Sequence, residues 1–499
     1  MPGRRATLRV RASQLSDWRV PVLIGLLALV LWSGIDAITE MFPVKPYEVA
    51  NDWRVFYAAA QLVQRGGNLY NPIAVHLAQQ AVWRFPPSST PLNYFLDLPV
   101  VAWLLTPFTL LGFWASFVVW TSIGVLVAAA WLRAWLRESG WLRCWPWVVA
   151  GLALRPVLEG FAGGQFDALM LGGLLGSLLL MRRNRPWLAG LCMVVVLLKP
   201  DLLWPLPLLL FAVWTPQPAR AWRFAAAAAG VVIGGAAAGF ALGPGLADYV
   251  THVFGLAASS FGNVPADMSG IPRLLAPLPG GRPLGDAVSA VGALLVLVLA
   301  VACWRNRGLR RLPDRDRAVV VLTGLAVWLA CTGYVHSVDD VLLLPLLAVL
   351  IGVRGEALDV RWMGAAAVVC LVFMAALDVS WWFVDALLLL VVVLWIWRRR
   401  LVSQGAAGSV SLVATVLLQV AEPLSPVMAA TIAAAGVLWV VTRMRGAVAT
   451  PTDAEPLPRF RAAHRRVAAP ESKHRPGWAG SGGGVESDHR SASPVRLEA

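Results

Sequence analysis

The first residue that could do chemistry is Asp52, in the polar and aromatic stretch KPYEVANDWRVFYAAAQLVQRGGNLYNP (residues 45–72). It begins an apolar-aromatic run, where the N-terminus of a helix would favour the ionised carboxylate. An ionised carboxylate that accepts a proton in the transition state is a general base. Arg54, two residues on, offers a positive partner for a phosphate group. The simpler alternative for Asp52 is a solvated loop residue.

A second polar stretch, EGFAGGQFDALML (159–171), interrupts apolar sequence and contains Gln165 and Asp167. One interpretation is a tight turn built on Gly163 and Gly164. The other is that Gln165 and Asp167 line a polar cavity, because polar groups without partners are expensive at membrane depth.

A third stretch, LLKPDLLWP (197–205), contains Lys199, one of three lysines in the chain. A lysine beside a membrane run can extend its ammonium group to the interface. Alternatively, Lys199 contacts a phosphate or pyrophosphate, or pairs with Asp201 or another carboxylate.

A fourth stretch, YVHSVDDVLLLP (334–345), places His336, Asp339 and Asp340 at the start of an apolar run. The spacing of His336 and Asp340 puts both on one face of a helix. These residues do not form a recognised set of metal ligands. The pattern favours a hydrogen-bonded pair that orients a sugar or a phosphate.

Small and polar residues in the segment 244–284 suit contact with an acceptor molecule or a lipid head group, and we select Asn263 and Arg273 from them. Tyr57, close to Asp52 in sequence, is the third candidate on the acceptor side.

The elements that must position these residues are membrane helices. The chain has 499 residues, of which 58% are hydrophobic and 14% are charged, against about 25% charged in soluble proteins. Many runs approach the ~20 apolar residues of a membrane span. We therefore expect an all-α polytopic membrane protein. The formal charge of +14 comes from arginines at span ends, beside anionic lipid, and does not indicate nucleic-acid binding.

Placing the arginine clusters inside the cell gives roughly 12–14 spans and puts the loop 40–112, with its interfacial helices, outside. The stretch FPPSSTPLNYFLDLPVVAWLLTPFTLL within this loop is interrupted by prolines, and we expect it to lie in the interface or to dip in part way. The expected spans are residues 19–39, 113–133, 145–160, 166–181, 186–199, 201–214, 224–243, 285–303, 318–335, 340–353, 363–379, 381–397, 408–422 and 426–443.

Both ends of the chain differ from the middle. Residues 1–18 are basic, and residues 446–499 are rich in Pro, Ser, Gly and Arg, with too little apolar content for a packed core. We expect a cytoplasmic N-terminal tail, a transmembrane domain over residues 19–445 and a disordered cytoplasmic C-terminal tail. The localisation that follows is a plasma membrane, with the chemistry at its external face.

These stretches together resemble glycosyltransferase family 87, whose members transfer sugars from polyprenyl phosphate and have the GT-C architecture. The resemblance covers residues from about 20 to 400. It is carried by DWRVFYAAAQLVQRGGNLYNP, FPPSSTPL, GGQFDALML, LLKPDLLWPLPLLL and FGNVPADMSGIPRLL, and by the His-Asp stretch near residue 336. The sequence departs from the family pattern at Asp167, where Asn is common, and at Asp201, where Gln is common.

The resemblance implies that Asp52 is the catalytic base and that His336 belongs to the same site. It implies a sugar donor carried on polyprenyl phosphate and an acceptor that is a membrane-tethered lipoglycan or glycolipid. Attack on the face opposite the leaving phosphate would invert the anomeric centre. Mannose is the first expectation for the sugar, followed by arabinofuranose and glucose. Arg54, Lys199, Gln165, Asp167, His336 and Asp340 are the expected contacts for the donor sugar or phosphate.

Two other functions are open at this stage. A transporter or flippase of lipids would place charged residues near the bilayer midplane and repeat its halves, whereas a scaffold would lack a cavity joining Asp52, Lys199 and His336. No cofactor or metal ion is expected. The five cysteines are scattered and lack CxxC spacing, so we expect small buried residues. The marked preference for Arg over Lys is typical of a GC-rich genome, and we expect an actinobacterial source.

Overall fold

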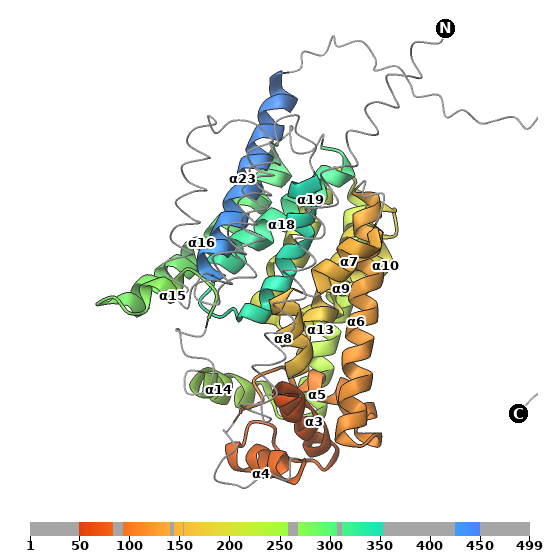
Figure 1. Cartoon of the computed structure of the whole chain (residues 1–499), viewed down its shortest axis with the longest axis vertical. Helices are drawn as coiled ribbons and strands as arrows, with labels where there is room; N and C mark the ends of the chain where they lie inside the picture. The colour runs from red at the N-terminus through yellow and green to blue at the C-terminus, as the bar shows by residue number, and fades with distance from the viewer. Residues whose placement is uncertain are drawn as a thin grey trace, which may run out of the picture. The chain divides into compact units, whose positions relative to one another are not determined.

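Three long apolar helices form the frame of the described structure (Figure 1). The computed structural model describes residues 49–82, 93–139, 144–152, 154–257, 268–306, 312–352 and 425–449. Within them, α6 (Phe113–Glu138), α13 (Pro218–Leu242) and α16 (Gly281–Arg305) are long and apolar enough to cross a membrane. These ranges contain no β-strand, and an isolated bridge joins Met268 to His336. The predicted all-α membrane fold is confirmed.

Shorter helices fill the space between these three. Among the described residues they include α9, which runs from the second polar stretch toward the arginines at its C-terminus. The shorter helices are α7 (Cys144–Leu152), α8 (Arg155–Gly163), α9 (Asp167–Arg182), α10 (Pro186–Leu191), η3 (Cys192–Leu197), α11 (Pro200–Leu203), α12 (Pro205–Trp214), α18 (Asp314–Cys331), η5 (Ser337–Leu343) and α19 (Leu344–Gly352). The helix α23 (Ser425–Ala449) is as long as α13 and α16 and packs against α18.

Prolines explain why several predicted spans are broken into pieces. Pro186, Pro200 and Pro205 each occupy one of the first positions of a helix, where the missing N–H costs no hydrogen bond. The predicted span 186–199 is therefore α10 followed by the 3-10 helix η3, and Lys199 lies at the junction before α11. The predicted span 145–160 is likewise divided between α7 and α8.

Short helices gather at one end of the bundle (Figure 1). They are α3 (Asn51–Gln64), α4 (Pro72–Val82), α5 (Pro99–Leu105) with η2 (Thr106–Leu110), and α14 (Leu246–Ala257); α15 (Pro272–Leu275) precedes α16. The segment Pro99–Leu110 is apolar but shorter than the ~17 residues that a span needs. Whether this segment lies in the interface stays a prediction.

The opposite end of the bundle carries ion pairs between helix termini. Glu138, at the end of α6, contacts Arg182 at 3.2 Å and Arg183 at 2.8 Å. Arg220, near the start of α13, contacts Asp314, the first residue of α18, at 2.8 Å. Basic residues thus lie at the end of α9 that is remote from Asp167.

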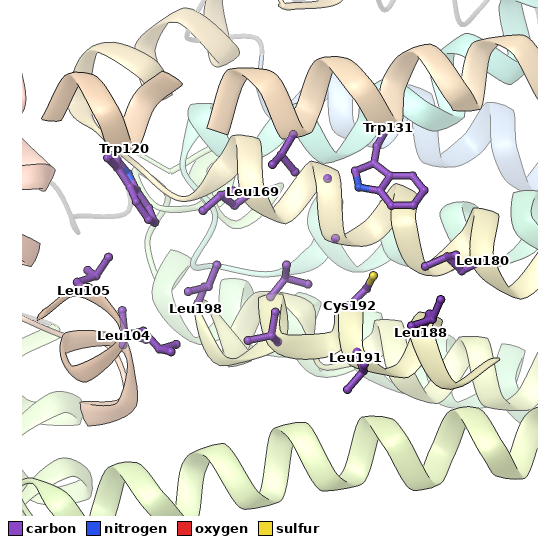
Figure 2. A pocket seen from close by; sticks show the side chains of 16 residues that line it. Leu104, Leu105, Trp120, Trp131, Leu169, Leu180, Leu188, Leu191, Cys192 and Leu198 are labelled. Carbon is purple, nitrogen blue, oxygen red and sulfur yellow. The ribbon is translucent and has the colours of Figure 1, made fainter. Parts of the chain in front are cut away.

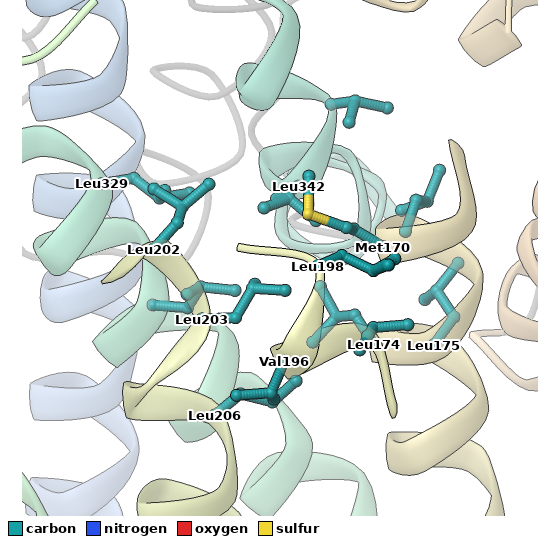
Figure 3. Close-up of a cluster of buried hydrophobic side chains, with 14 of the residues drawn as sticks. Met170, Leu174, Leu175, Val196, Leu198, Leu202, Leu203, Leu206, Leu329 and Leu342 are labelled. Carbon is teal, nitrogen blue, oxygen red and sulfur yellow. The ribbon is translucent and has the colours of Figure 1, made fainter. Parts of the chain in front are cut away.

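A cluster of buried leucines joins the central helices (Figure 3). Met170, Leu174 and Leu175 of α9 and Leu202 and Leu203 of α11 belong to this cluster, and no more than 1% of any of these side chains is exposed. Side chains from η3, α12, α18 and η5 complete the cluster. Because this core is close-packed, it fixes the position of the segment around residue 199 relative to α9 and η5.

Several predictions lie outside the described residues. They are the spans 19–39, 363–379, 381–397 and 408–422, the tail 1–18, and residues 450–499 of the other tail. The number of 12–14 spans and the cytoplasmic position of both tails therefore stay predictions.

The contact between α10 and α13 depends on Gly190. A Cβ atom there would lie 2.5 Å from Ala227 Cβ and 2.7 Å from the Phe224 carbonyl oxygen. We expect Gly190→Ala to destabilise the protein by about 1–3 kcal/mol through overpacking, measured as a lower unfolding temperature in detergent micelles. The matched control is Gly230→Ala on α13, where a Cβ meets nothing within 4 Å. Equal unfolding temperatures for the two variants would contradict this packing.

Candidate active site

Asp52 is the second residue of α3, and its helix starts from a strained backbone. Ala50, which precedes the helix, has φ 58° and ψ 25°, in the left-handed region. This conformation costs a non-glycine residue roughly 1–2 kcal/mol. The amide of Ala50 donates a 2.7 Å hydrogen bond to the carbonyl of Ala162 in α8. The strained residue therefore ties the start of α3, and Asp52 with it, to α8.

Aromatic side chains of α3 hold this helix against α6 and α9. The indole N–H of Trp53 donates to Ser116 Oγ at 3.0 Å, and its ring stacks on Trp120 with centroids 5.1 Å apart. Phe56 contacts Phe166, beside α9, at a centroid distance of 4.2 Å. The alternation of polar and aromatic residues in the first stretch thus buries the aromatic groups and leaves Asp52 partly exposed.

The turn between α8 and α9 contacts Asp52 directly. A Cβ atom on Gly163 would lie 2.8 Å from Asp52 Oδ2, and one on Gly164 would lie 2.6 Å from Trp53 Cβ. Gly164 ends α8 with φ 79°, which an L-residue adopts only at a cost. The side chain of Gln165 hydrogen-bonds Asp52. The stretch is thus a glycine turn, as one interpretation predicted, and the turn brings Gln165 to Asp52. The polar cavity of the other interpretation stays a prediction.

Lys199 joins the site from the start of α11. Its ammonium lies 2.6 Å from Asp339 Oδ1 and 3.6 Å from Asp167 Oδ1. About 12% of the lysine side chain is exposed, and the two carboxylate side chains are exposed by no more than 3%. The ammonium is therefore held inside the protein by two carboxylates, and it does not extend to the interface.

Asp339 comes from η5, where it also caps the helix. Its second oxygen, Oδ2, accepts a 2.9 Å hydrogen bond from the backbone amide of His336, and the two residues form a capping box. Asp340, which the spacing argument selected, instead contacts Ser269 Oγ at 3.5 Å. The structure thus places Asp339, and not Asp340, against Lys199.

Burial and charge act in opposite directions on Asp52. Burial disfavours the charged carboxylate and raises the pKa of Asp52, while the Gln165 hydrogen bond, Lys199 and Arg54 partly offset this effect. Burial likewise raises the pKa of Asp97 to about 7, and the charges of Asp201 and Asp52 add to this rise. Both carboxyl groups therefore take up protons at a higher pH than an aspartate in water.

Two predicted residues take other positions in the structure. Arg54 is fully buried, and its Nη2 donates to Asn51 Oδ1 at 2.7 Å, so it has no exposed surface to meet a phosphate. The hydroxyl of Tyr57 donates to the carbonyl of Leu111 at 2.7 Å, and its ring packs edge-on against Phe113. Tyr57 is therefore part of the packing between α3 and α6.

The remaining predicted residues are His336, Arg273 and Asn263. The ring of His336 packs edge-on against Tyr334 at 5.7 Å. Arg273 Nη1 donates to the carbonyl of Met268 at 3.2 Å, and Met268 pairs with His336 through the isolated bridge. Asn263 lies outside the described residues.

Two residues of the site were not selected from the sequence. Asp339 was named with Asp340 but was not selected, since the argument used the i, i+4 spacing of His336 and Asp340, whereas the chain there forms a 3-10 helix. Asp97 lies in the first loop, where its charge interacts with Asp52 and Lys199. Its position just before Pro99, the first residue of α5, is the sequence signal that could have selected it.

Metal binding finds no support in this part of the chain. Within the described ranges, no group of three or more His, Cys, Asp or Glu side chains could hold a metal ion. Whether the reaction proceeds without a metal ion stays a prediction.

The arrangement suits the transfer of a group away from a phosphate. A partly exposed carboxylate can take a proton, and a buried ammonium whose charge acts on that carboxylate can face a developing negative charge. The model of glycosyltransferase family 87 matches residues 95–332. The chain carries a glycosyltransferase family 87 domain. It is a membrane glycosyltransferase, as the resemblance implied.

The family match covers just under half of the chain. It includes Gln165, Asp167 and Lys199, while Asp52 and Asp339 lie outside its limits. Neither the curated proteins nor the solved structures contain a match to this chain. The candidate site therefore combines residues inside the matched range with residues of the flanking helices α3 and η5.

The ion pairs of Lys199 predict unequal effects on stability. Lys199→Met leaves Asp167 and Asp339 facing each other without a cation, and losing one partner of a buried pair costs about 3–5 kcal/mol. The double variant Lys199→Met/Asp339→Asn should recover part of this loss, which thermal unfolding in detergent measures as a double-mutant cycle. The control is Arg183→Met, since the side chain of Arg183 is 49% exposed and surface pairs contribute little. Strictly additive effects of the two substitutions would contradict the coupling.

Proposed function

We propose that this glycosyltransferase moves a sugar from a polyprenyl-phosphate donor to a hydroxyl group of a membrane-tethered lipoglycan or glycolipid. Asp52 is the general base, and the anomeric centre is inverted. The observation that carries the proposal is the position of Asp52, a partly exposed carboxylate bonded to Gln165 and close to the charge of Lys199.

The reaction needs one proton transfer and one displacement. The acceptor oxygen attacks the anomeric carbon while its proton passes to the carboxylate of Asp52. The bond between the anomeric carbon and the phosphate oxygen breaks, and its electron pair leaves with polyprenyl phosphate. The phosphate departs as an anion, so no acid is needed if a cation faces it.

Lys199 is the cation best placed for this role. An ammonium group has three N–H donors, and the contacts with Asp339 and Asp167 account for two carboxylate partners. A third N–H is thus left for an oxygen of the donor phosphate. Because the two carboxylates balance much of the lysine charge, a phosphodiester with a single negative charge suits this site better than a more highly charged group.

The distribution of charge supports a site at the external face. Asp52 meets the turn before α9, whereas Arg182 and Arg183 lie at the other end of that helix. Arginines gather on the cytoplasmic side of membrane proteins. The end of α9 that carries Asp167 is then the outer end.

The identity of the sugar follows from the resemblance alone. Mannose is the first donor to test, with arabinofuranose and glucose as alternatives. Incubating the purified protein with each polyprenyl-phosphate sugar and a lipoglycan fraction distinguishes them, because a product forms only with the accepted donor.

Replacing the base tests the proposal. Asp52→Asn keeps the size of the side chain but removes the proton acceptor, so kcat should fall by about 10²–10⁴ while the unfolding temperature changes little. Asp286→Asn, an exposed carboxylate on α16, is the control and should retain wild-type turnover. Wild-type turnover by Asp52→Asn would refute the assignment.

The raised pKa of Asp52 predicts how the rate depends on pH. The base acts only when deprotonated, so kcat/KM should fall as the pH drops through the pKa of Asp52. Because burial raises this pKa above 3.8, the fall should begin at a higher pH than for an ordinary aspartate. The pKa of Asp97 is raised to about 7, so Asp97 could also produce an acidic limb. The variant Asp97→Asn distinguishes the contribution of Asp97 to the pH profile from that of Asp52. If that variant loses the acidic limb of the profile, the limb belongs to Asp97.

A further inference from the structure

An apolar cavity of about 690 Å³ lies beside the site (Figure 2). Its walls come from α6, α9 and the segment formed by α10 and η3, and α5 closes one end. None of its 16 lining residues is charged. The volume falls within the range of small-molecule sites, so the cavity is large enough for a chain-like ligand.

The end of the cavity that α5 closes lies near the segments that carry the charged groups of the site. Leu169 and Leu198 line it, and they are near neighbours in sequence of Asp167 and Lys199, which contact each other. Trp120 also lines this end (Figure 2) and donates to the carbonyl of Gly164 in the turn that holds Asp52. A ligand in the cavity would therefore end beside the segment that carries Lys199 and the turn that carries Gln165.

The cavity follows α9 away from the site. Its lining extends along α9 from Leu169 to Leu180, a rise of about 16 Å at ~1.5 Å per residue. Leu188 lies at the far end beside Leu180 (Figure 2). Leu104, Leu191 and Val194 line the cavity and are 48%, 54% and 40% exposed. The cavity is therefore a groove whose rim contacts bilayer hydrocarbon.

We propose that this groove binds the lipid chain of the sugar donor and that its far end determines which chains the enzyme accepts. This inference rests on the proposed function. In a polyprenyl-phosphate sugar, the lipid chain is joined to the same phosphate that leaves the anomeric carbon. The chain must therefore start at the reacting atoms. The acyl chains of a glycolipid acceptor are separated from its reacting hydroxyl by the whole head group, so they need no groove at this point.

Shape, and not hydrophobic transfer, gives the groove its selectivity. Lipid tails are as apolar as the leucines of the groove, so moving a chain from the bilayer into it gains packing contacts only. Two walls of the groove, α9 and η3, also lie close together, since a Cβ atom on Gly173 of α9 would overlap the side chain of Val195 in η3. A bulky residue at the far end should therefore exclude long chains while short chains still fit.

The substitution Leu188→Trp tests the far end of the groove. We expect the KM for a long polyprenyl-phosphate donor to rise by about tenfold to a hundredfold, while the KM for a donor with two isoprene units stays unchanged. The matched control is Leu295→Trp on α16, because Leu188 and Leu295 are both 49% exposed and Leu295 does not line the groove. An equal response of both variants to the long donor would overturn the proposal.

A cross-linking experiment gives a readout that does not depend on turnover. The probe is polyprenyl monophosphate with a diazirine at the end of its chain, added to the full-length protein in lipid nanodiscs. We expect adducts on peptides that contain Trp131, Leu180 or Leu188, and competition by unlabelled polyprenyl monophosphate but not by phosphatidylglycerol. Adducts confined to α13 or α16, or equal competition by phosphatidylglycerol, would overturn the proposal.

The two experiments separate this proposal from the proposed function. Adducts in the groove without transfer from any polyprenyl-phosphate sugar would leave the groove assignment standing and refute the donor. Transfer with equal responses to Leu188→Trp and Leu295→Trp would refute the groove and leave the donor standing.

Discussion

The site depends on a lysine that two carboxylates hold inside the protein. Lys199 reaches Asp167 at the start of α9 and Asp339 in η5, so three segments far apart in sequence meet at one ammonium group. A buried charge is stable only when it is paired. Because each of the three residues needs the others, their helices cannot shift independently. Gln165, two residues before Asp167, then sets the position of Asp52.

Glycines and prolines make this meeting geometrically feasible. Gly163 and Gly164 let α3 approach the turn before α9 more closely than a side chain would permit. Pro200 starts α11 directly after Lys199, so the ammonium projects from a break between helices. Non-helical backbone at this depth is tolerated where it is buried in protein or lines a cavity. The breaks in the predicted spans are thus the places where the site is built.

Polar residues that interrupt apolar sequence were the easiest to select. The carboxylate of Asp52 and the turn at Gln165 were selected because polar groups in apolar sequence need partners, and the structure brings them together. Arg54 and Tyr57 were selected for their chemistry, but both are used in packing, through Asn51 and Leu111 respectively. Sequence spacing cannot distinguish these outcomes, because a buried arginine or tyrosine also requires a hydrogen-bond partner.

Composition by itself determined that this chain is an all-α membrane protein, since only helices satisfy the backbone of so many apolar runs in lipid. The motifs also determined the family and its reaction class. Only the tertiary structure decided which carboxylates pair with Lys199, that Asp339 replaces Asp340 there, and that an apolar groove leads away from the site along α9. The physical reason is that pairing and cavity shape depend on helix packing, to which residues far apart in sequence contribute together.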